Sequence, residues 1–268
     1  MDNTFNVLTM TRFGRMLVNK NDVYIGQSLL RYGEYSWAEI LLLEQLIAPD
    51  SVIVEAGANI GSHTVPLSQR VNGGGLVFAF EPQRMVFQTL CANLALNQCV
   101  NVFSFWGGVG ERKGSISIPD LSPFVANNFG GIGANLGDDQ QTMLSVPCQT
   151  IDELGLERCN LIKADVEGME LEVIKGAKGT IDAYRPILYL EADRKDRFPL
   201  LARALFELDY QLWWHTPDLY SADNIFSDSE DVYSILSANI LGLPRENKTP
   251  VTGLMPIADE NDWVGSKY

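Results

Sequence analysis

Residues 52–61 read VIVEAGANIG, a short apolar run that ends in an acid and a glycine-containing turn. Such a run is typical of a fully buried parallel strand, and residues 62–71 behind the turn can form a helix. Gly57 and Gly61 allow the backbone to pass close to a ligand, where a Cβ atom would collide with it. The unpaired N–H groups at the start of the helix point to the same place. The stretch therefore predicts a strand–turn–helix unit that holds a polar small molecule at the carboxyl edge of a sheet.

The spacing within this turn favours one cofactor over another. A dinucleotide-binding turn has three glycines in the pattern G-x-G-x-x-G. This chain has Gly57, Asn59 and Ser62 at those positions, so only the first position fits. The observed pattern is E-x-G-x-N-x-G, which begins at Glu55 and ends at Gly61. It suits S-adenosylmethionine (SAM), because an acid in the turn can meet the ammonium group of its amino-acid tail and backbone N–H groups can meet the carboxylate.

A second acid follows at the spacing that a nucleoside cofactor requires. Glu81 closes the apolar run LVFAFEP, and an acid at the end of the second strand commonly accepts both ribose hydroxyls. His63 lies just past the glycine turn, where it either lines the cofactor site or packs beside it. The alternative for the whole stretch is a tight strand-to-helix turn in an unrelated α/β protein.

Composition indicates an ordinary globular chain with an acidic surface. Its 268 residues suit a single α/β domain, and 46% of them are hydrophobic and 20% charged. The formal net charge is −14 and no run of Lys or Arg is present, which argues against a nucleic-acid partner and against an anionic membrane surface. The N-terminus has no apolar signal segment, and no window of about 18 apolar residues predicts a transmembrane helix. The expected location is the cytoplasm.

The four cysteines do not form a metal-binding pattern. They lie at Cys91, Cys99, Cys148 and Cys159, with no C-x-x-C pair and no nearby His. Buried reduced thiols are the favoured interpretation.

The remaining chain alternates between strand and helix patterns. Residues 13–26 predict a hairpin with its turn at 19–22, and residues 37–47 predict a helix that Ser36 caps, with Glu39 three residues on. Further strands are predicted at residues 76–81, 102–106, 115–118, 161–164, 186–190, 210–214 and 238–243, and further helices at 82–97, from about 171, and at 198–208. This alternation predicts a mostly parallel sheet with helices on both faces. We expect one domain over residues 1–268, made of an N-terminal hairpin and helix (1–48), a catalytic core (49–246) and a loosely structured tail (247–268).

Two segments are candidates for closing a site. Residues 119–144 contain several Gly, Pro and Asn residues and little periodicity, so they form either a substrate-facing loop or a surface insertion. Residues 32–35 read YGEY and either close over the cofactor or lead into the next helix while packing on the sheet.

Acids at the ends of two later strands are the candidates for catalysis. Asp165 ends one strand with Glu167 two positions on, and Glu191 ends another with Asp193 close behind. Because the carboxyl ends of parallel strands converge on one crevice, these acids are expected to face the methyl group and the acceptor. A carboxylate there can take the proton from an acceptor hydroxyl. Alternatively, Asp165 with Glu191 or Asp193 can hold Mg²⁺, or all of these acids simply cap helices.

With GANIG, FEP, DVEGME and NIL in this order, the chain resembles the FkbM family of SAM-dependent methyltransferases over roughly residues 32–243. The resemblance implies a class I methyltransferase fold, Rossmann-like, with a seven-stranded sheet whose last strand is antiparallel. It also implies methyl transfer to a hydroxyl oxygen, often of sugars or macrolide-type natural products. Carried over by position, the residues that hold the amino-acid end of SAM are Glu55, Gly57, Asn59 and Gly61. Glu81 would hold the ribose and Asp165 would border the transfer site, while the first acid, commonly Asp in such sequences, is Glu55 here.

Other functions and assemblies stay open at this stage. A SAM-binding module that acts through a partner without catalysis is one alternative, and an NAD-dependent oxidoreductase is a weaker one because G-x-G-x-x-G is missing. The sequence contains no D/N/S-P-P-Y/F signature of the kind used to methylate the amines of nucleic-acid bases. The acceptor itself is not identified, and a homodimer is one option for an oligomeric state that the sequence leaves unknown.

Overall fold

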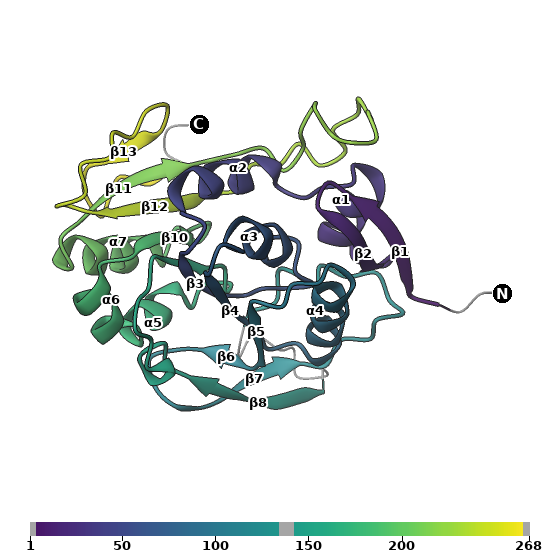
Figure 1. Cartoon of the computed structure of the whole chain (residues 1–268), viewed down its shortest axis with the longest axis horizontal. Helices are drawn as coiled ribbons and strands as arrows, with labels where there is room; N and C mark the ends of the chain where they lie inside the picture. Colours follow the sequence, from purple (N-terminus) through teal and green to yellow (C-terminus); the bar gives the residue numbers. More distant parts are fainter. Residues whose placement is uncertain (1–3, 134–141, 265–268) are drawn as a thin grey trace.

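The computed structural model describes residues 4–133 and 142–264, and an eight-stranded sheet runs through its centre (Figure 1). In spatial order the strands are β13 (Met255–Ile257), β11 (Tyr210–His215), β12 (Asn239–Pro244), β10 (Ile187–Glu191), β9 (Leu161–Ala164), β3 (Val52–Ala56), β4 (Leu76–Glu81) and β5 (Val102–Trp106). The five strands from β10 to β5 are parallel, and β12 runs antiparallel to both of its neighbours. The mostly parallel sheet with a late antiparallel strand is confirmed.

The eighth strand corrects the prediction of a loosely structured tail after residue 247. β13 pairs antiparallel with β11, with Met255 opposite Trp214 and Ile257 opposite Leu212. The strand has only three residues and Pro256 at its centre, so its sequence carries little strand signal. Proline lacks a backbone N–H and is tolerated here because β13 is an edge strand.

Helices cover both faces of the sheet, as the alternating pattern predicts. One face carries α2 (Trp37–Leu46), α3 (Thr64–Arg70) and α4 (Arg84–Leu96), and the other carries α5 (Glu170–Lys175), α6 (Lys178–Tyr184) and α7 (Phe198–Glu207). Successive residues of β3 serve opposite faces: Ile53 packs in the core under α2–α4, and Val54 packs in the core under α5–α7. A strand buried on both faces reads as a continuous apolar run, which explains VIV at its start.

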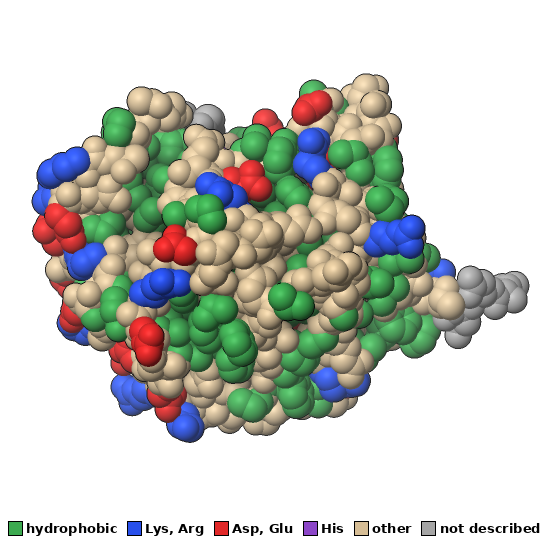
Figure 2. All heavy atoms as spheres, in the orientation of Figure 1, with side chains coloured by type: hydrophobic (Ala, Val, Ile, Leu, Met, Phe, Trp, Pro, Cys, Tyr) green, Lys and Arg blue, Asp and Glu red, His purple; other side chains and the backbone are tan. Residues whose placement is uncertain are grey.

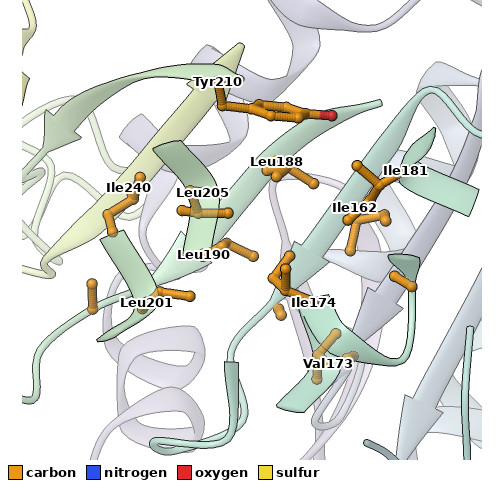
Figure 3. Close-up of a cluster of buried hydrophobic side chains, with 14 of the residues drawn as sticks. Ile162, Val173, Ile174, Ile181, Leu188, Leu190, Leu201, Leu205, Tyr210 and Ile240 are labelled. Carbon is orange, nitrogen blue, oxygen red and sulfur yellow. The ribbon is translucent and has the colours of Figure 1, made fainter. Parts of the chain in front are cut away.

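The core on the α5–α7 face is shown in Figure 3. Ile162 and Leu188 project from adjacent parallel strands toward Val173, Ile174 and other apolar side chains of the covering helices. All of these side chains are almost fully removed from solvent. This packing fixes the positions at which β9 and β10 end, and therefore the positions of the acids that follow those ends.

The N-terminal hairpin lies elsewhere than predicted. It consists of β1 (Asn6–Thr11) and β2 (Gly14–Asn19), with its turn at Arg12 and Phe13. The predicted turn residues have another role, because the Asp22 carboxylate accepts the backbone N–H of Tyr24 (3.1 Å) at the start of α1 (Ile25–Arg31). Turn formers and helix caps are the same residue types, which is why the pattern misleads here.

The predicted cap of the next helix is also corrected. α2 begins at Trp37 as expected, but Ser36 adopts a left-handed conformation (φ 46°) and makes no capping hydrogen bond. Its hydroxyl instead donates to the Glu39 carboxylate (2.6 Å), and both side chains are buried.

A small second sheet lies beside the main one (Figure 1). Its strands are β6 (Gly108–Val109), β8 (Met143–Gln149) and β7 (Gly114–Pro119), and a single 3₁₀ turn (Asp152–Leu154) follows. The irregular segment predicted at 119–144 begins and ends in these strands. Its part at 120–133 reaches the N-terminal region, where Asn127 pairs with Asp22, and its part at 134–141 lies outside the described residues.

The connection between β11 and β12, residues 216–238, is fastened to the N-terminal region. Arg31 of α1 binds the carboxylates of Asp228 and Glu230, each at 2.6 Å. The Tyr32 hydroxyl donates to the carbonyl of Glu230 and accepts the N–H of Val232. In Figure 1 this connection is the yellow-green loop beside α1. We call residues 216–238 the strap.

The surface carries mixed charges. On the face shown in Figure 2, Lys and Arg side chains lie among Asp and Glu side chains and form no continuous basic patch over the described residues. Within 4–133 and 142–264, no helix combines the length and apolar composition that crossing a bilayer requires.

Two leucines of α7 test the assignment of its buried face. Leu205 is fully buried, whereas Leu200 on the same helix is 54% exposed. We expect Leu205→Ala to lower the free energy of unfolding by about 2–5 kcal/mol, because it leaves a cavity in the core. Leu200→Ala makes the same chemical change and should cost no more than about 0.5 kcal/mol. Urea denaturation measures both, and equal losses would contradict this packing.

Candidate active site

A cavity of about 350 Å³ opens at the carboxyl ends of β3, β4, β9 and β10. This size lies near the lower end of the range for small-molecule sites, roughly 300–1,000 Å³. Its polar and charged lining residues are Tyr24, Tyr35, Asn59, Glu81, Gln83, Asn128, Asp165, Glu167, Glu191, Asp193 and Ser237. Apolar lining comes from, among others, Ile25, Phe80, Ile116, Ile118, Ile132, Met169, Leu219, Ile235 and Leu236. The 120–133 segment and the strap both contribute walls, so the substrate-facing interpretation of residues 119–144 gains support for its described part.

The cavity brings together six of the nine residues predicted for the site. Those that line it are Gly57, Asn59, Glu81, Asp165, Glu191 and Asp193. Glu55, Gly61 and His63 lie behind its wall.

The two glycines of the turn make room for different neighbours. A Cβ atom on Gly57 (φ +84°) would lie 1.8 Å from the carbonyl oxygen of Asp165, so the ends of β3 and β9 approach as closely as their backbones allow. A Cβ on Gly61 (φ +90°) would lie 2.9 Å from a methyl group of Leu90 in α4. We expected both glycines to make room for a ligand, and the structure gives each a neighbour within the protein.

Glu81 is held in a fixed orientation at the cavity wall. Its two carboxylate oxygens accept the backbone N–H groups of Asn59 (3.0 Å) and Gln83 (2.7 Å). Asn59 has a positive φ of 49°, which turns its N–H toward this carboxylate. Burial raises the pKa of Glu81 to about 8, although the two N–H bonds oppose the rise. In the ionised form each oxygen keeps a second lone pair, so the group can accept hydrogen bonds from a ligand, and such donors favour this form.

Glu55 has an internal partner. It is fully buried, accepts a hydrogen bond from the Thr64 hydroxyl (2.7 Å) and lies 3.7 Å from the ammonium group of Lys163. Lys163 sits directly opposite Glu55 in the sheet and also approaches the Asp165 carboxylate at 3.8 Å. Burial lowers the pKa of Lys163, but Asp165, Glu55 and other carboxylates outweigh it, so the net shift is upward and the ammonium stays charged.

Our sequence reading missed Lys163. The available signal was a lysine inside the four-residue strand LIKA, which is otherwise apolar and buried. A charged residue at such a position requires a buried partner of opposite charge.

His63 is buried beside the cavity and does not line it. Its Nε2 atom has no hydrogen-bond partner among the described residues, and burial lowers the pKa of the imidazole well below its usual value. The ring lies 5.9 Å from the ring of Tyr35, which does line the cavity. In the segment at 32–35, the Glu34 carboxylate binds Arg12 (2.6 Å) and does not line the cavity. The contact between this segment and the cavity comes from Tyr35.

Three carboxylates converge at the ends of β9 and β10. Asp165, Glu167 and Glu191 each place an oxygen within 4.8 Å of the others, so Glu167 stands where we expected Asp193 in a metal-binding set. Asp193 lines the cavity, and its carboxylate lies 3.8 Å from Arg194. Glu167 has a positive φ of 57° and binds Arg194 at 2.6 Å. Burial raises the pKa of Glu167 to about 7, and burial with the neighbouring acids raises the pKa of Glu191 well above its usual value.

A fourth acid shapes the loop that carries this cluster. Glu170, the first residue of α5, accepts the backbone N–H groups of Val166 and Gly168, both at 3.1 Å. The DVEG segment is therefore tied to the start of its own helix, which fixes the direction of the carboxylates at 165 and 167.

The sheet order, the glycine turn after β3 and the acid that ends β4 define a class I methyltransferase fold with Rossmann-like architecture. The chain belongs to the methyltransferase FkbM domain family, whose model matches residues 55–212. The resemblance in the sequence is thereby confirmed.

Individual relatives are more distant. The hexuronic acid methyltransferase AglP of Haloferax volcanii is 31% identical over 168 residues, which cover 61% of this chain and 66% of AglP. The crystal structure of methyltransferase FkbM from Methylobacillus flagellatus has a TM-score of 0.48 at 22% identity and covers 73% of this chain and 44% of that one. Wild-type Trm5b of Pyrococcus abyssi has a TM-score of 0.50 at 12% identity over 91% of this chain and 56% of that one, a likeness of fold alone. The match spans less than two thirds of the length of each.

Removing the buried ammonium group tests the internal ion pairs. Lys163→Met leaves the Glu55 carboxylate buried without a cation, so we expect a loss of about 3–5 kcal/mol in the free energy of unfolding. The double variant Lys163→Met/Glu55→Gln should recover part of this loss, because the uncompensated charge is gone. Lys178→Met removes an exposed pair with Asp182 and should cost no more than about 0.5 kcal/mol. Equal effects at the two lysines in urea denaturation would refute this role.

A pair of glycines tests the contact between β3 and β9. Gly57 and Gly74 both have positive φ (84° and 106°), but nothing lies within 4 Å of a Cβ built on Gly74. Alanine at either position pays a similar backbone cost of about 1 kcal/mol. Gly57→Ala should lose about 1–3 kcal/mol more because of its collision with the Asp165 carbonyl. Thermal denaturation of both variants measures the difference, and its absence would argue against the close approach.

Proposed function

We propose that this protein is a SAM-dependent methyltransferase that transfers a methyl group to a hydroxyl oxygen of a small molecule or a glycan. The observation that carries the proposal is the Glu81 carboxylate, which is fixed at the cavity wall beside the Gly57 turn. The cluster of acids lines the same cavity, past the end of β9. Family membership supports methyl transfer, the fixed Glu81 carboxylate supports a nucleoside end of the cavity, and the acid cluster supports an acidic end.

The donor would lie along the strand ends. The ribose hydroxyls would donate to Glu81, and the amino-acid tail would lie against the turn formed by Gly57 and Asn59. The sulfonium would then face Asp165. Glu55 and His63, which lie behind the wall, would support the turn through Thr64 and Tyr35 rather than contact the donor directly.

The chemical step needs positioning and proton removal. The acceptor oxygen attacks the methyl carbon, the carbon–sulfur bond breaks with its electron pair going to sulfur, and the hydroxyl proton passes to a carboxylate. Asp165 is the proposed base, since its half-exposed carboxylate lines the cavity, and Glu191 is the neighbouring acid that would orient the acceptor. Alignment of the two reactants supplies much of the acceleration in such reactions.

A second form of the proposal includes a divalent cation. The oxygen atoms of Asp165, Glu167 and Glu191 lie within 4.8 Å of one another, and oxygen ligands suit Mg²⁺. The ion would hold the acceptor hydroxyl and favour its ionised form. Full turnover in the presence of EDTA would exclude this form and leave the carboxylates to act alone.

The alternative functions make different predictions. A SAM-binding module without catalysis would bind SAM and yield no S-adenosylhomocysteine with any hydroxylated acceptor. An NAD-dependent oxidoreductase would bind NAD in competition with SAM. Calorimetry with both cofactors, followed by a turnover assay with neutral, acidic and amino sugars and with polyketide alcohols, separates the three.

Glu81 provides the sharpest test of the donor site. Glu81→Gln keeps the size of the side chain but replaces one acceptor oxygen by an NH₂ group, which cannot accept from a ribose hydroxyl or from a backbone N–H, so we expect the affinity for SAM to fall by about 2–4 kcal/mol in calorimetry. Glu111→Gln alters an acid that does not line the cavity and should leave the affinity unchanged. Unchanged affinity of the Glu81 variant for SAM would contradict the proposal that the ribose binds to Glu81.

A further inference from the structure

Every Asp, Glu, Lys, Arg or His side chain in the described lining of the cavity is a carboxylic acid. Its described lining includes five carboxylates, at Glu81, Asp165, Glu167, Glu191 and Asp193, and no Lys, Arg or His. The described segments that approach it, residues 114–133 and the strap at 216–238, also contain no basic residue.

Two cations close to these acids, Lys163 and Arg194, lie outside the described lining of the cavity and are already paired. Lys163 lies behind Asp165 and shares its charge with Glu55, at distances of 3.8 and 3.7 Å. Arg194 binds Glu167 at 2.6 Å. Two cations therefore face four carboxylates at the ends of β9 and β10, in addition to the buried Glu55.

One oxygen of this group has no partner. Glu191 lines the cavity, but its Oε2 atom has almost no contact with solvent and no hydrogen-bond partner among residues 4–133 and 142–264. Burial and the neighbouring acids raise the pKa of Glu191 and so disfavour its charged form, and a positive charge brought into the cavity would stabilise that form.

Resting on the proposed function, we propose that the methyl end of the cavity selects for positive charge, so that it holds the sulfonium of SAM and releases the neutral thioether of S-adenosylhomocysteine. Methyl transfer moves the methyl group from sulfur to the acceptor oxygen, and the electron pair of the broken bond neutralises the sulfur. The hydroxyl proton passes to a carboxylate, so the cluster loses one negative charge as the sulfur loses its positive one. The attraction that holds the donor thereby disappears in the same step that forms the product.

The two compounds form a matched pair, because they share the adenosine and the amino-acid tail and differ in the methyl group and its charge. At about 6 Å and an effective dielectric constant of about 20, one carboxylate favours a unit positive charge by roughly a hundredfold in binding. Allowing for screening and for the paired cations, we expect SAM to bind at least about tenfold more tightly than S-adenosylhomocysteine.

Calorimetry with the full-length protein in about 0.05 M salt and EDTA tests the proposal without an acceptor. EDTA keeps divalent cations from neutralising the acids. Asp165→Asn and Glu191→Gln should each lower the affinity for SAM several-fold and leave that for S-adenosylhomocysteine unchanged, so that the second ligand also reports that each variant is folded. Raising the salt to about 0.5 M should also reduce the ratio of the affinity for SAM to the affinity for S-adenosylhomocysteine, because salt screens the attraction.

Asp196→Asn is the matched control. Asp196 follows β10 like Asp193, but its side chain is 84% exposed and does not line the cavity, so the ratio should not change. Equal or tighter binding of S-adenosylhomocysteine by the unaltered protein would overturn the proposal, as would a ratio that neither cavity variant reduces. Binding of neither compound would overturn the proposed function along with it, whereas tight binding of both with no preference would overturn the charge selectivity alone.

Discussion

The buried ammonium group of Lys163 is the constraint on which the site depends. It lies within the sheet, opposite Glu55 and next to Asp165, so one positive charge joins the strand before the glycine turn to the strand before the acid cluster. Gly57 reinforces the same junction, because only a residue without a side chain fits against the Asp165 carbonyl. Together they fix the distance between the two halves of the cavity. One half is the turn that would hold the donor, and the other is the group of acids that would receive the proton.

The central fold was largely predictable because two inner strands of its sheet, β3 and β9, are buried on both faces. An apolar run such as residues 52–56 fits few structures other than a buried strand, and the helices between such strands follow with regular spacing. One failure lies where one residue type serves two structures. The residues at 19–22 predict a hairpin turn, but Asn19 ends β2 and the Asp22 carboxylate accepts the N–H of Tyr24 just before α1. The short edge strand around Pro256 was missed for another reason, because its pairing depends on β11 rather than on its own sequence.

The sequence predicted the site from the residues at the ends of strands. It did not predict the role of Glu167 in the acid cluster or the pairing of Glu55 with Lys163. Glu81 and Asp165 directly end or follow a strand, so topology alone places them at the cavity. Glu167 joins the acid cluster because the backbone takes a left-handed turn there, a conformation that no periodicity reveals. The internal partner of Glu55 was equally hidden, since it comes from a strand more than 100 positions away.

The fastening of the strap to α1 has a consequence for the boundaries of the functional unit. Tyr24, Ile25 and Tyr35 reach the cavity from one side of the family match at 55–212, and the strap reaches it from the other. The block that matches the family thus carries the turn and the acid cluster, whereas part of the enclosure is added by flanking sequence. A fragment trimmed to the block would expose its acids to bulk water, and a chimera that exchanges both flanks as a pair would be the rational way to graft a new substrate preference onto it.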